Sequence, residues 1–456
     1  MRALVIGAGQ VGSAIVSALD GERLDVVAID VDEERLRELR EAHDIQTVCG
    51  SGSNPRVLAE AGVATAEMIV AVTDSDEVNM VACGTAGLYA PHAIKVARIR
   101  EVALLEDPEV LGERGFHVDY AINPEMVTAQ RLADVIDVPI ATDVAECGRG
   151  ILLTGMRLPP DTPLSGKTFA ELRAGAPDLR MLVIHRIRDG KSSVPRGSDD
   201  LSAGDTCYVV CRPDDLPRVA ELFHLSWRPA RRITIAGGGG GVGELLARRL
   251  ESIGRYQIKL IESDPERAAR LAENLDRTLV LRGSPTEESL LLEENIGDCD
   301  VFVAAHSDEE ANVMSALNAK RLGARRVIAL IDKTSYIPII EAAGVDSVIS
   351  PRALAIGTIV HHVRKGKVKA VITYGLAGQA EAIEFEALET APSMGKPLKD
   401  IRFPEGAIVG VLTRGEEVII PGGDDMILPG DDVFVFAHKS AIPKLEKLMS
   451  VGLEFF

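Results

Sequence analysis

The sequence predicts an α/β protein with two Rossmann-like, doubly wound parallel sheets, each followed by a small α+β domain. Three observations favour this fold class. In residues 1–125 and 231–352, short runs of Val, Ile and Ala alternate with helical segments, which is typical of parallel sheets. A glycine-rich turn follows the first apolar run of each stretch. The shorter stretches 140–225 and 368–456 hold strand-like runs separated by Pro and Gly turns.

Length and composition limit the classes of protein. The 456 residues exceed one core, since a domain usually holds roughly 100 to 200 residues. The formal net charge of −19 argues against nucleic acid as a partner, because binding it requires a surface of Lys and Arg. No apolar run approaches the roughly 18 residues of a membrane span, so a cytoplasmic protein is expected. Six scattered cysteines without a C-x-x-C pair predict no metal site, and Cys207 and Cys211 are expected to be buried in a strand.

The first glycine turn follows an apolar strand at residues 3–6 and has the spacing G-x-G-x-x-G. In this motif the first glycine permits a tight turn and the second lets a pyrophosphate approach the backbone. The third packs the helix against the strand, and the helix N-terminus adds a positive dipole. The residues predicted to meet the pyrophosphate are Gly7, Ala8, Gly9, Gln10, Val11 and Gly12.

An acidic residue ends the second predicted strand. Asp30 stands 18 residues after Gly12, the place of a carboxylate that holds a ribose 2′-hydroxyl. A carboxylate there repels a 2′-phosphate. NAD or adenine nucleotides are therefore favoured over NADP.

Further candidate residues follow later strands of the same domain. Ser51 lies in a turn of small residues at 50–53 that permits close approach of a ligand. Thr73 and Asp74 follow the apolar run 68–72, at the carboxyl edge where such folds bind nucleotides. Arg98 ends the next strand, where a cation meets phosphate oxygens, and a surface ion pair is the alternative.

The whole arrangement occurs twice. Gly243 stands 231 residues after Gly12, and a run of five glycines precedes it at 237–241. Aligning the two motifs places the second G-x-G-x-x-G at Gly238, Gly240 and Gly243. The residues predicted to bind nucleotide in the second copy are Gly238, Gly239, Gly240, Gly241, Val242 and Glu262.

The two copies differ at positions that face the ligand. Arg98 projects onto Ile331, Pro285 stands where Gly52 stood, and His306 replaces Thr73. We therefore expect the second site to bind a smaller or different nucleotide, to bind more weakly, or to be partly vestigial.

The small domains repeat as well. The Gly204 and Asp205 pair recurs at Gly430 and Asp431. Neither small domain offers the set of His, Lys and carboxylate that a dehydrogenase requires, so no enzyme is predicted.

With these landmarks the chain resembles the TrkA family, cytoplasmic regulators of Trk-type potassium uptake built from tandem regulator of potassium conductance (RCK) units. The resemblance rests on the glycine turn with Gln10 and Val11, on Asp30, on the turn at 50–53, on the segment 76–79 that ends in Asn79, on Arg98 and on the repeated small domains. It implies that the large domains bind NAD(H) and ATP or ADP. It also implies a homo-oligomeric ring, with a tetramer expected. The ring would dock on the inner face of the cell membrane, under a potassium-channel-like subunit of the TrkH/TrkG type.

Carried over by position, the resemblance assigns the pyrophosphate to residues 7–11 and the ribose to Asp30. Thr73 and Asp74 would meet the far half of the ligand, and Arg98 its phosphates. Two alternatives stay open: a regulator of another cation transporter, and an NAD-dependent oxidoreductase.

Overall fold

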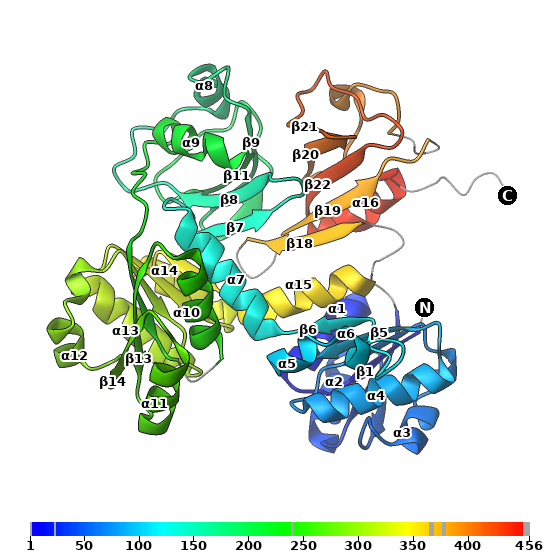
Figure 1. Ribbon diagram of the computed structural model, residues 1–456. Helices are drawn as coiled ribbons and strands as arrows, with labels where there is room; N and C mark the ends of the chain where they lie inside the picture. Colours follow the sequence, from blue (N-terminus) through cyan, green and yellow to red (C-terminus); the bar gives the residue numbers. More distant parts are fainter. Residues whose placement is uncertain are drawn as a thin grey trace. The chain divides into compact units, whose positions relative to one another are not determined.

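The computed structural model describes residues 2–21, 24–238, 241–363, 369–375, 380–389, 391 and 393–449. The chain divides into two compact units. One unit holds residues 1–127 together with 352–365, and the other holds residues 128–351 together with 366–456. Figure 1 shows the elements of both units in chain order.

The first unit contains a six-stranded parallel sheet in the order β3-β2-β1-β4-β5-β6. The strands read as continuous apolar runs because both faces of the sheet are buried. The predicted doubly wound fold is confirmed. The strands are β1 (Arg2–Ile6), β2 (Asp25–Asp30), β3 (Gln46–Cys49), β4 (Met68–Ala71), β5 (Ile94–Arg98) and β6 (Tyr120–Ile122). The helices are α1 (Gln10–Gly21), α2 (Glu33–Ala42), α3 (Pro55–Glu60), α4 (Asp76–Tyr89), α5 (Val102–Leu105) and α6 (Pro108–Leu111).

A helix from the far end of the chain completes this unit. Ile356 and Ile359 of α15 (Pro351–Val363) pack with Ile15 and Val16 of α1 in the core on one face of the sheet. α15 therefore lies beside α1, although it follows the last strand of the second large sheet in sequence (Figure 1).

The second unit contains the other parallel sheet, in the order β14-β13-β12-β15-β16-β17. Its strand order repeats that of the first sheet, as the duplication predicts. The strands are β12 (Arg232–Ala236), β13 (Gln257–Glu262), β14 (Thr278–Arg282), β15 (Val301–Ala304), β16 (Arg326–Leu330) and β17 (Ser347–Ile349). The helices are α10 (Val242–Ile253), α11 (Pro265–Asn274), α12 (Glu288–Glu293), α13 (Glu309–Arg321) and α14 (Ile337–Ala342).

Arg326 joins the end of α7 (Pro124–Asp137) to this sheet. Its Nη1 donates to the carbonyls of Val135 at 3.0 Å and Val138 at 3.2 Å, and its Nη2 donates to that of Ala141. The guanidinium thus caps carbonyls at the C-terminus of the helix, where a positive charge is favourable. Burial lowers the pKa of Arg326 to about 10.

Two small antiparallel sheets complete the second unit. Their orders are β10-β9-β11-β8-β7 and β18-β19-β22-β20-β21, which are the same order read from opposite edges. The strands of the first are β7 (Asp143–Glu146), β8 (Leu152–Arg157), β9 (Met181–Arg188), β10 (Lys191–Ser193) and β11 (Thr206–Cys211). Those of the second are β18 (Ala370–Tyr374), β19 (Ala380–Glu386), β20 (Ala407–Arg414), β21 (Glu417–Ile419) and β22 (Asp432–His438). The helices are α8 (Phe169–Ala174), α9 (Leu216–Leu222) and α16 (Ile442–Met449).

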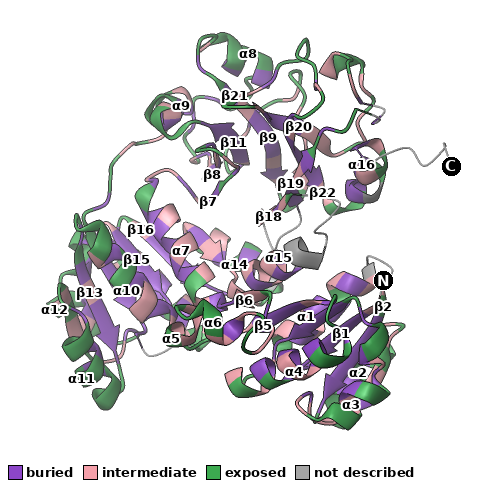
Figure 2. Ribbon diagram, turned by 45° about the vertical axis from the view of Figure 1, so that its right-hand side comes forward, coloured by how far each residue is buried: buried purple, intermediate pink, exposed green. Residues whose placement is uncertain are grey.

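The two small sheets share one apolar core. Tyr208 of β11 packs on Tyr374 of β18, with ring centroids 5.1 Å apart, and Tyr374 contacts Phe436 of β22. Figure 2 shows the buried strands of both sheets facing one another. His185 is buried in this core, 5.7 Å from the Tyr374 ring, and it hydrogen-bonds to Ser192.

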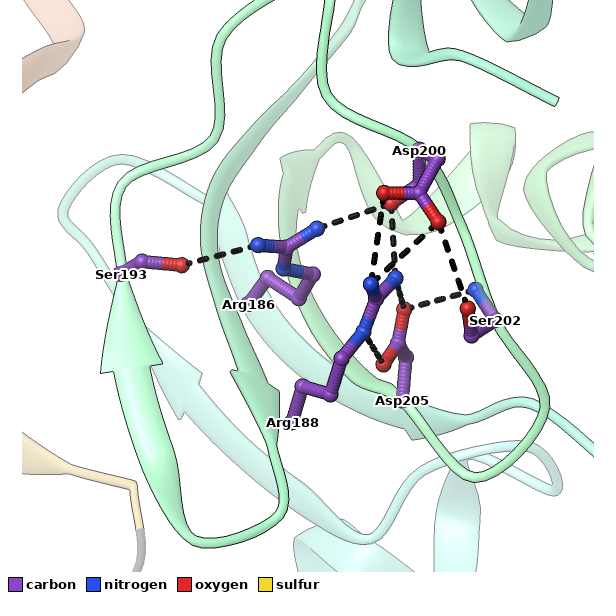
Figure 3. A network of polar contacts seen from close by, with 6 residues as sticks. All are labelled: Arg186, Arg188, Ser193, Asp200, Ser202 and Asp205. Atoms are coloured by element: carbon purple, nitrogen blue, oxygen red, sulfur yellow. Dashed lines mark hydrogen bonds and ion pairs between the residues drawn. The ribbon is translucent and has the colours of Figure 1, made fainter. Parts of the chain in front are cut away.

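An ion pair between a buried aspartate and a partly exposed arginine holds the Gly-Asp turn of each small domain. In the first, Asp205 accepts from Arg188 Nε at 2.7 Å and Nη2 at 2.8 Å (Figure 3). In the second, Asp431 accepts from Arg414 Nε and Nη2, both at 2.9 Å. The repeated turn is thus a structural device, since each glycine has a positive φ and each aspartate is buried.

The cysteines in the first small domain are buried as predicted. Cys207 and Cys211 lie on one face of β11, and burial raises the pKa of both thiols to about 12. No helix among the described residues is long and apolar enough to cross a membrane. The same residues bring together no group of three or more His, Cys, Asp or Glu side chains that would hold a metal ion.

Candidate nucleotide site

The first and third glycines of the first glycine turn (Gly7–Gly12) are required by close packing. Gly7 has a φ of 103°, and a Cβ on it would lie 2.9 Å from the backbone N of Thr73. A Cβ on Gly12 would lie 1.7 Å from the carbonyl oxygen of Gly7. The turn therefore packs directly against the loop after β4, at the switch point of the sheet where such folds bind ligands.

Gly9 differs from the other two because its surroundings are open. The nearest atom to a Cβ on Gly9 would be Arg35 Nη1, at 3.8 Å. The bare backbone of Gly9 leaves space for a phosphate, and the guanidinium of Arg35 in α2 lies beside that space. These residues fit the pyrophosphate of a nucleotide.

Asp30 stands at the end of β2 and touches the glycine turn. Its Oδ2 accepts from Ala8 N at 2.5 Å, and its Oδ1 accepts from Asp32 N at 2.9 Å. The residue is 9% exposed. A carboxylate has roughly four acceptor positions, so two remain for ribose hydroxyls.

The loop after β4 is held by a residue that the sequence analysis did not select as part of the site. The buried Asn79 of α4 accepts from Thr73 N at 2.9 Å. Its Nδ2 donates to Thr73 O at 3.2 Å and to Arg98 O at 2.9 Å. One side chain thus fixes both Thr73 and the end of β5. Asp74 is exposed on the same loop, and Ser75 caps α4.

Ser51 lies in the turn after β3, next to Asp30. Gly50 N donates to Asp30 O at 2.8 Å, and the hydroxyls of Ser51 and Ser53 are 2.8 Å apart. The turn after β3 therefore lies next to the end of β2.

Arg98 forms an ion pair at the end of β5. Its Nη2 lies 3.1 Å from Oε1 of Glu125, in the first turn of α7, and its side chain is 15% exposed. The ion pair is therefore partly buried. Among the described residues, Arg98 Nε has no hydrogen-bond partner. A buried donor without an acceptor suits a phosphate oxygen.

The structure corrects the alignment of the second glycine turn (Gly237–Gly243). The counterpart of Gly7 is Gly237, with a φ of 99° and an amide that donates to Ile261 O as Gly7 N donates to Ile29 O. The prediction that Gly238 is the first glycine is wrong by one residue, because this turn holds one residue more. Gly238 instead packs on Leu260 and Leu271.

The other predicted residues of the second turn lie around the start of α10. Gly241 precedes the helix with a φ of 84°, and Val242 is its first residue. Glu262 is buried and accepts from Asp264 N at 2.9 Å, as Asp30 accepts from Asp32 N. The predicted residues Gly239 and Gly240 lie outside the described residues.

The second copy keeps the asparagine but not the arginine. Asn312 accepts from His306 N at 2.7 Å and donates to Leu330 O at 3.0 Å. Leu330 is therefore the counterpart of Arg98, and the predicted Ile331 is wrong by one residue. Leu330 and Ile331 are both buried and apolar, so neither supplies a cation at the position of Arg98.

Packing explains why the second copy can have a proline where the first copy has Gly52. A Cβ on Gly52 would lie 2.1 Å from Cγ2 of Ile6. The second copy has Pro285 at the position of Gly52 and Ala236 at the position of Ile6. Because Ala236 is smaller than Ile6, it leaves room in the second copy for the ring of Pro285.

These features define a duplicated Rossmann-type protein with one complete glycine-turn site and one altered site. Comparisons then identify the family. The profile of the TrkA-N domain matches residues 3–124 and 233–351, and that of the TrkA-C domain matches residues 153–224 and 382–450. The chain belongs to the TrkA family, which confirms the predicted resemblance.

Relatives in the family align with the whole chain. The Trk system potassium uptake protein TrkA of Halomonas elongata is 37% identical over 460 residues, covering 100% of both chains. TrkA homolog 1 of Methanosarcina mazei is 34% identical over 453 residues, covering 98% of this chain and 99% of its own length.

Solved structures show the same fold. The GsuK channel has a TM-score of 0.63 at 17% identity, covering 98% of this chain and 78% of that chain. A structure of the GsuK channel bound to NAD has a TM-score of 0.61, with the same identity and coverage.

Proposed function

We propose that this protein is the nucleotide-sensing cytosolic subunit of a potassium uptake system and that it gates a separate potassium-conducting membrane protein. Relatives that align over the full length are named for Trk potassium uptake. A structural neighbour is described as bound to NAD. The observation that carries the proposal is the open backbone of Gly9, flanked by Asp30 and Arg35.

The ligands we propose for the first site are NAD(H), ATP and ADP. The pyrophosphate would lie over Gly9 at the N-terminus of α1, and the ribose would bind Asp30. Thr73 and Asp74 would face the far half of the ligand. The second site lacks the arginine, so we propose that it binds a nucleotide more weakly or binds a different one.

Arg98 offers a route from the nucleotide to a helix. A phosphate that binds Arg98 competes with Glu125 for the same guanidinium and so loosens the first turn of α7. A nucleotide regulates a partner only if it binds two arrangements of the protein unequally, and a coupling of about 1 to 3 kcal/mol per site is typical. We propose that the protein forms a symmetric homo-tetramer, in which several such sites would act together.

Calorimetric titration of the full chain with NADH, ATP and ADP tests the proposed site. Gly9→Ala is expected to weaken binding at least tenfold, because its Cβ enters the phosphate space without touching the backbone. Gly422→Ala is the matched control, since the nearest atom to its Cβ would also be 3.8 Å away. Unchanged affinity in Gly9→Ala would rule out this site.

Potassium flux tests the gating role. Vesicles holding the TrkH/TrkG-type subunit are expected to change their flux when the protein and a nucleotide are added together. Loss of the nucleotide response in Gly9→Ala, with the protein still bound, would support the proposal. A nucleotide-independent flux would contradict it. Any specific oxidation of NADH by 2-oxo acids would instead indicate an oxidoreductase.

A further inference from the structure

A cavity of about 930 Å³ lies between the first small domain and the second large sheet, within the second compact unit. Val301 and Arg326, the first residues of β15 and β16, line it. The cavity therefore lies at the amino edge of this parallel sheet, whereas the second glycine turn follows the carboxyl end of β12. Its volume falls in the range of small-molecule sites, roughly 300 to 1,000 Å³. The other walls come from segments 139–142, 157–160, 225–230 and 341–346.

Hydrogen bonds join the walls of this cavity across the junction. The hydroxyl of Ser347 in β17 donates to the carbonyl of Thr142. Nη2 of Arg325 donates to the carbonyl of Arg228, in the segment that links the two domains, at 3.0 Å. These bonds act together with those from Arg326 to the end of α7. Specific contacts therefore hold the cavity in shape.

Basic residues outnumber acidic ones around the cavity, although the chain has a formal net charge of −19. The two acidic residues are Glu341 and Asp346. Asp346 already accepts from Lys320 Nζ at 2.7 and 2.8 Å and from Val327 N at 2.7 Å. The excess of positive charge favours an anionic ligand. The five basic residues are Arg157, Arg228, Lys320, Arg325 and Arg326.

Arg157, at the end of β8, is the basic residue with donors to spare. Its side chain is 37% exposed, and its Nη1 lies 3.6 Å from Oε2 of Glu341, which is too long for a hydrogen bond. Among the residues that the structure describes, this guanidinium has no other ion-pair partner. Burial raises the pKa of Glu341, and Arg157 opposes that shift. The charged form of Glu341 is thus disfavoured where it stands, so a carboxylate from a ligand can take its place.

Apolar side chains line much of the remaining wall. They come from the segment after α7, from the end of β8 and from the linker between the domains. They are Pro139, Ile140, Pro159, Pro160 and Leu225. A cavity that combines such a surface with a few charged groups suits a ligand that has an apolar body and one charged end.

We propose that this cavity binds a small organic anion, whose carboxylate pairs with Arg157 and whose apolar part lies against Pro159 and Leu225. A guanidinium matches a carboxylate with two parallel hydrogen bonds. The ligand replaces the contact of Arg157 with Glu341, so it acts on the junction between the first small domain and α14. This site does not depend on a nucleotide in either glycine turn.

Fluorescence titration of the full chain with pyrenebutyrate, a carboxylate on an apolar ring system, tests the proposal. Wild type is expected to bind it saturably and at least about fivefold more tightly than the uncharged pyrenebutanol. Arg157→Gln is expected to weaken pyrenebutyrate binding about tenfold and to leave pyrenebutanol binding unchanged. Glu341→Gln is expected to strengthen pyrenebutyrate binding about threefold, because the competing carboxylate is removed.

Arg232→Gln is the matched control. Arg232 also has a carboxylate, that of Asp298, 3.6 Å away, but it lines a different cavity. This variant should bind pyrenebutyrate as wild type does. An equal loss in Arg232→Gln and Arg157→Gln would overturn the proposal, because the loss would not be specific to this cavity.

Other outcomes would also overturn the proposal. Equal affinity of wild type for pyrenebutyrate and pyrenebutanol would mean that the cavity does not recognise an anion. Displacement of the probe by ATP would assign it to a glycine turn, and equally ready displacement by inorganic phosphate would mean that the apolar part contributes nothing. If Arg157→Gln fails to fold, Glu341→Gln gives the answer, and unchanged or weaker binding of pyrenebutyrate overturns the proposal.

Discussion

Arg98 and Glu125 form an incomplete ion pair between the end of β5 and the first turn of α7. One contact of 3.1 Å joins them, and the two side chains are only 15% and 22% exposed. Within the described part of the chain, Arg98 Nε and Glu125 Oε2 are buried without hydrogen-bond partners. A partly buried pair with buried, unsatisfied polar atoms exchanges partners more readily than a complete one.

The first prediction concerns this pair. Arg98→Gln is expected to weaken nucleotide binding about tenfold, because a charge-assisted hydrogen bond to phosphate is lost. Glu125→Gln is expected to strengthen binding by about threefold, since a competing carboxylate is removed. Calorimetry with ATP measures both. Equal effects in the same direction would show that the pair serves stability rather than ligand exchange.

The second prediction concerns Asn79, which holds Thr73 and the end of β5 together. Asn79→Ala is expected to lower the free energy of unfolding by about 3 kcal/mol, because buried groups of Thr73 and Arg98 lose their partners. Urea unfolding measures the change. Asn54→Ala, which removes an exposed helix cap, is the control and should cost about 1 kcal/mol. A similar cost for both variants would contradict the role of Asn79.

The third prediction concerns Gly52 and Ile6. Gly52→Ala is expected to destabilise the chain by about 2 kcal/mol, because the new Cβ overlaps a stiff, buried side chain. In an Ile6→Ala background the same change should cost at least about 1 kcal/mol less, because the side chain in its way is smaller. The double-mutant cycle is measured by urea unfolding. Additive costs would show that the exchange to Ala236 and Pro285 in the second copy is unrelated to this contact.

The fourth prediction concerns the turn drawn in Figure 3. Asp205 accepts from Arg188 and from Ser202 N while fully buried. Asp205→Ala is expected to cost about 2 kcal/mol, because the charge-assisted hydrogen bonds that the buried carboxylate accepts from Arg188 and the bond from Ser202 N are lost. Asp200→Ala should cost only a small fraction of that, because Asp200 is exposed and lies 3.3 Å from Arg188. Thermal unfolding compares the two, and equal losses would contradict the assignment.

The fifth prediction concerns pH. Burial, with a smaller effect of the charge on His438, lowers the pKa of His185 to about 4. The unfolded chain therefore binds more protons than the folded one between the ordinary value of about 6.5 and pH 4, so stability falls as pH falls through this range. At pH 5 the loss relative to pH 7 is expected to be about 2 kcal/mol.

Urea unfolding at both pH values measures this loss. His185→Phe should reduce the difference, whereas His92→Gln, an exposed position, should leave it unchanged. The same pH dependence in wild type and His185→Phe would assign the effect to other groups.

The sequence by itself determined the fold class, the duplication and the family. Alternation of apolar runs with helical segments predicts parallel sheets because the pattern is local. The glycine turn and Asp30 are likewise short-range signals, and both stand where the motif requires. Repetition of these signals along the chain was enough to reveal the second copy.

The tertiary structure alone decided which residues meet. Hydrogen bonds in the structure identify Gly237 as the counterpart of Gly7 and Leu330 as the counterpart of Arg98. A constant offset between the two copies in sequence misses each of them by one residue. Asn79 acts through backbone groups that are 6 and 19 positions away. Arg352 reaches Gln10 across 342 positions because α15 packs on α1. Such contacts depend on how whole elements pack, and no local pattern records that.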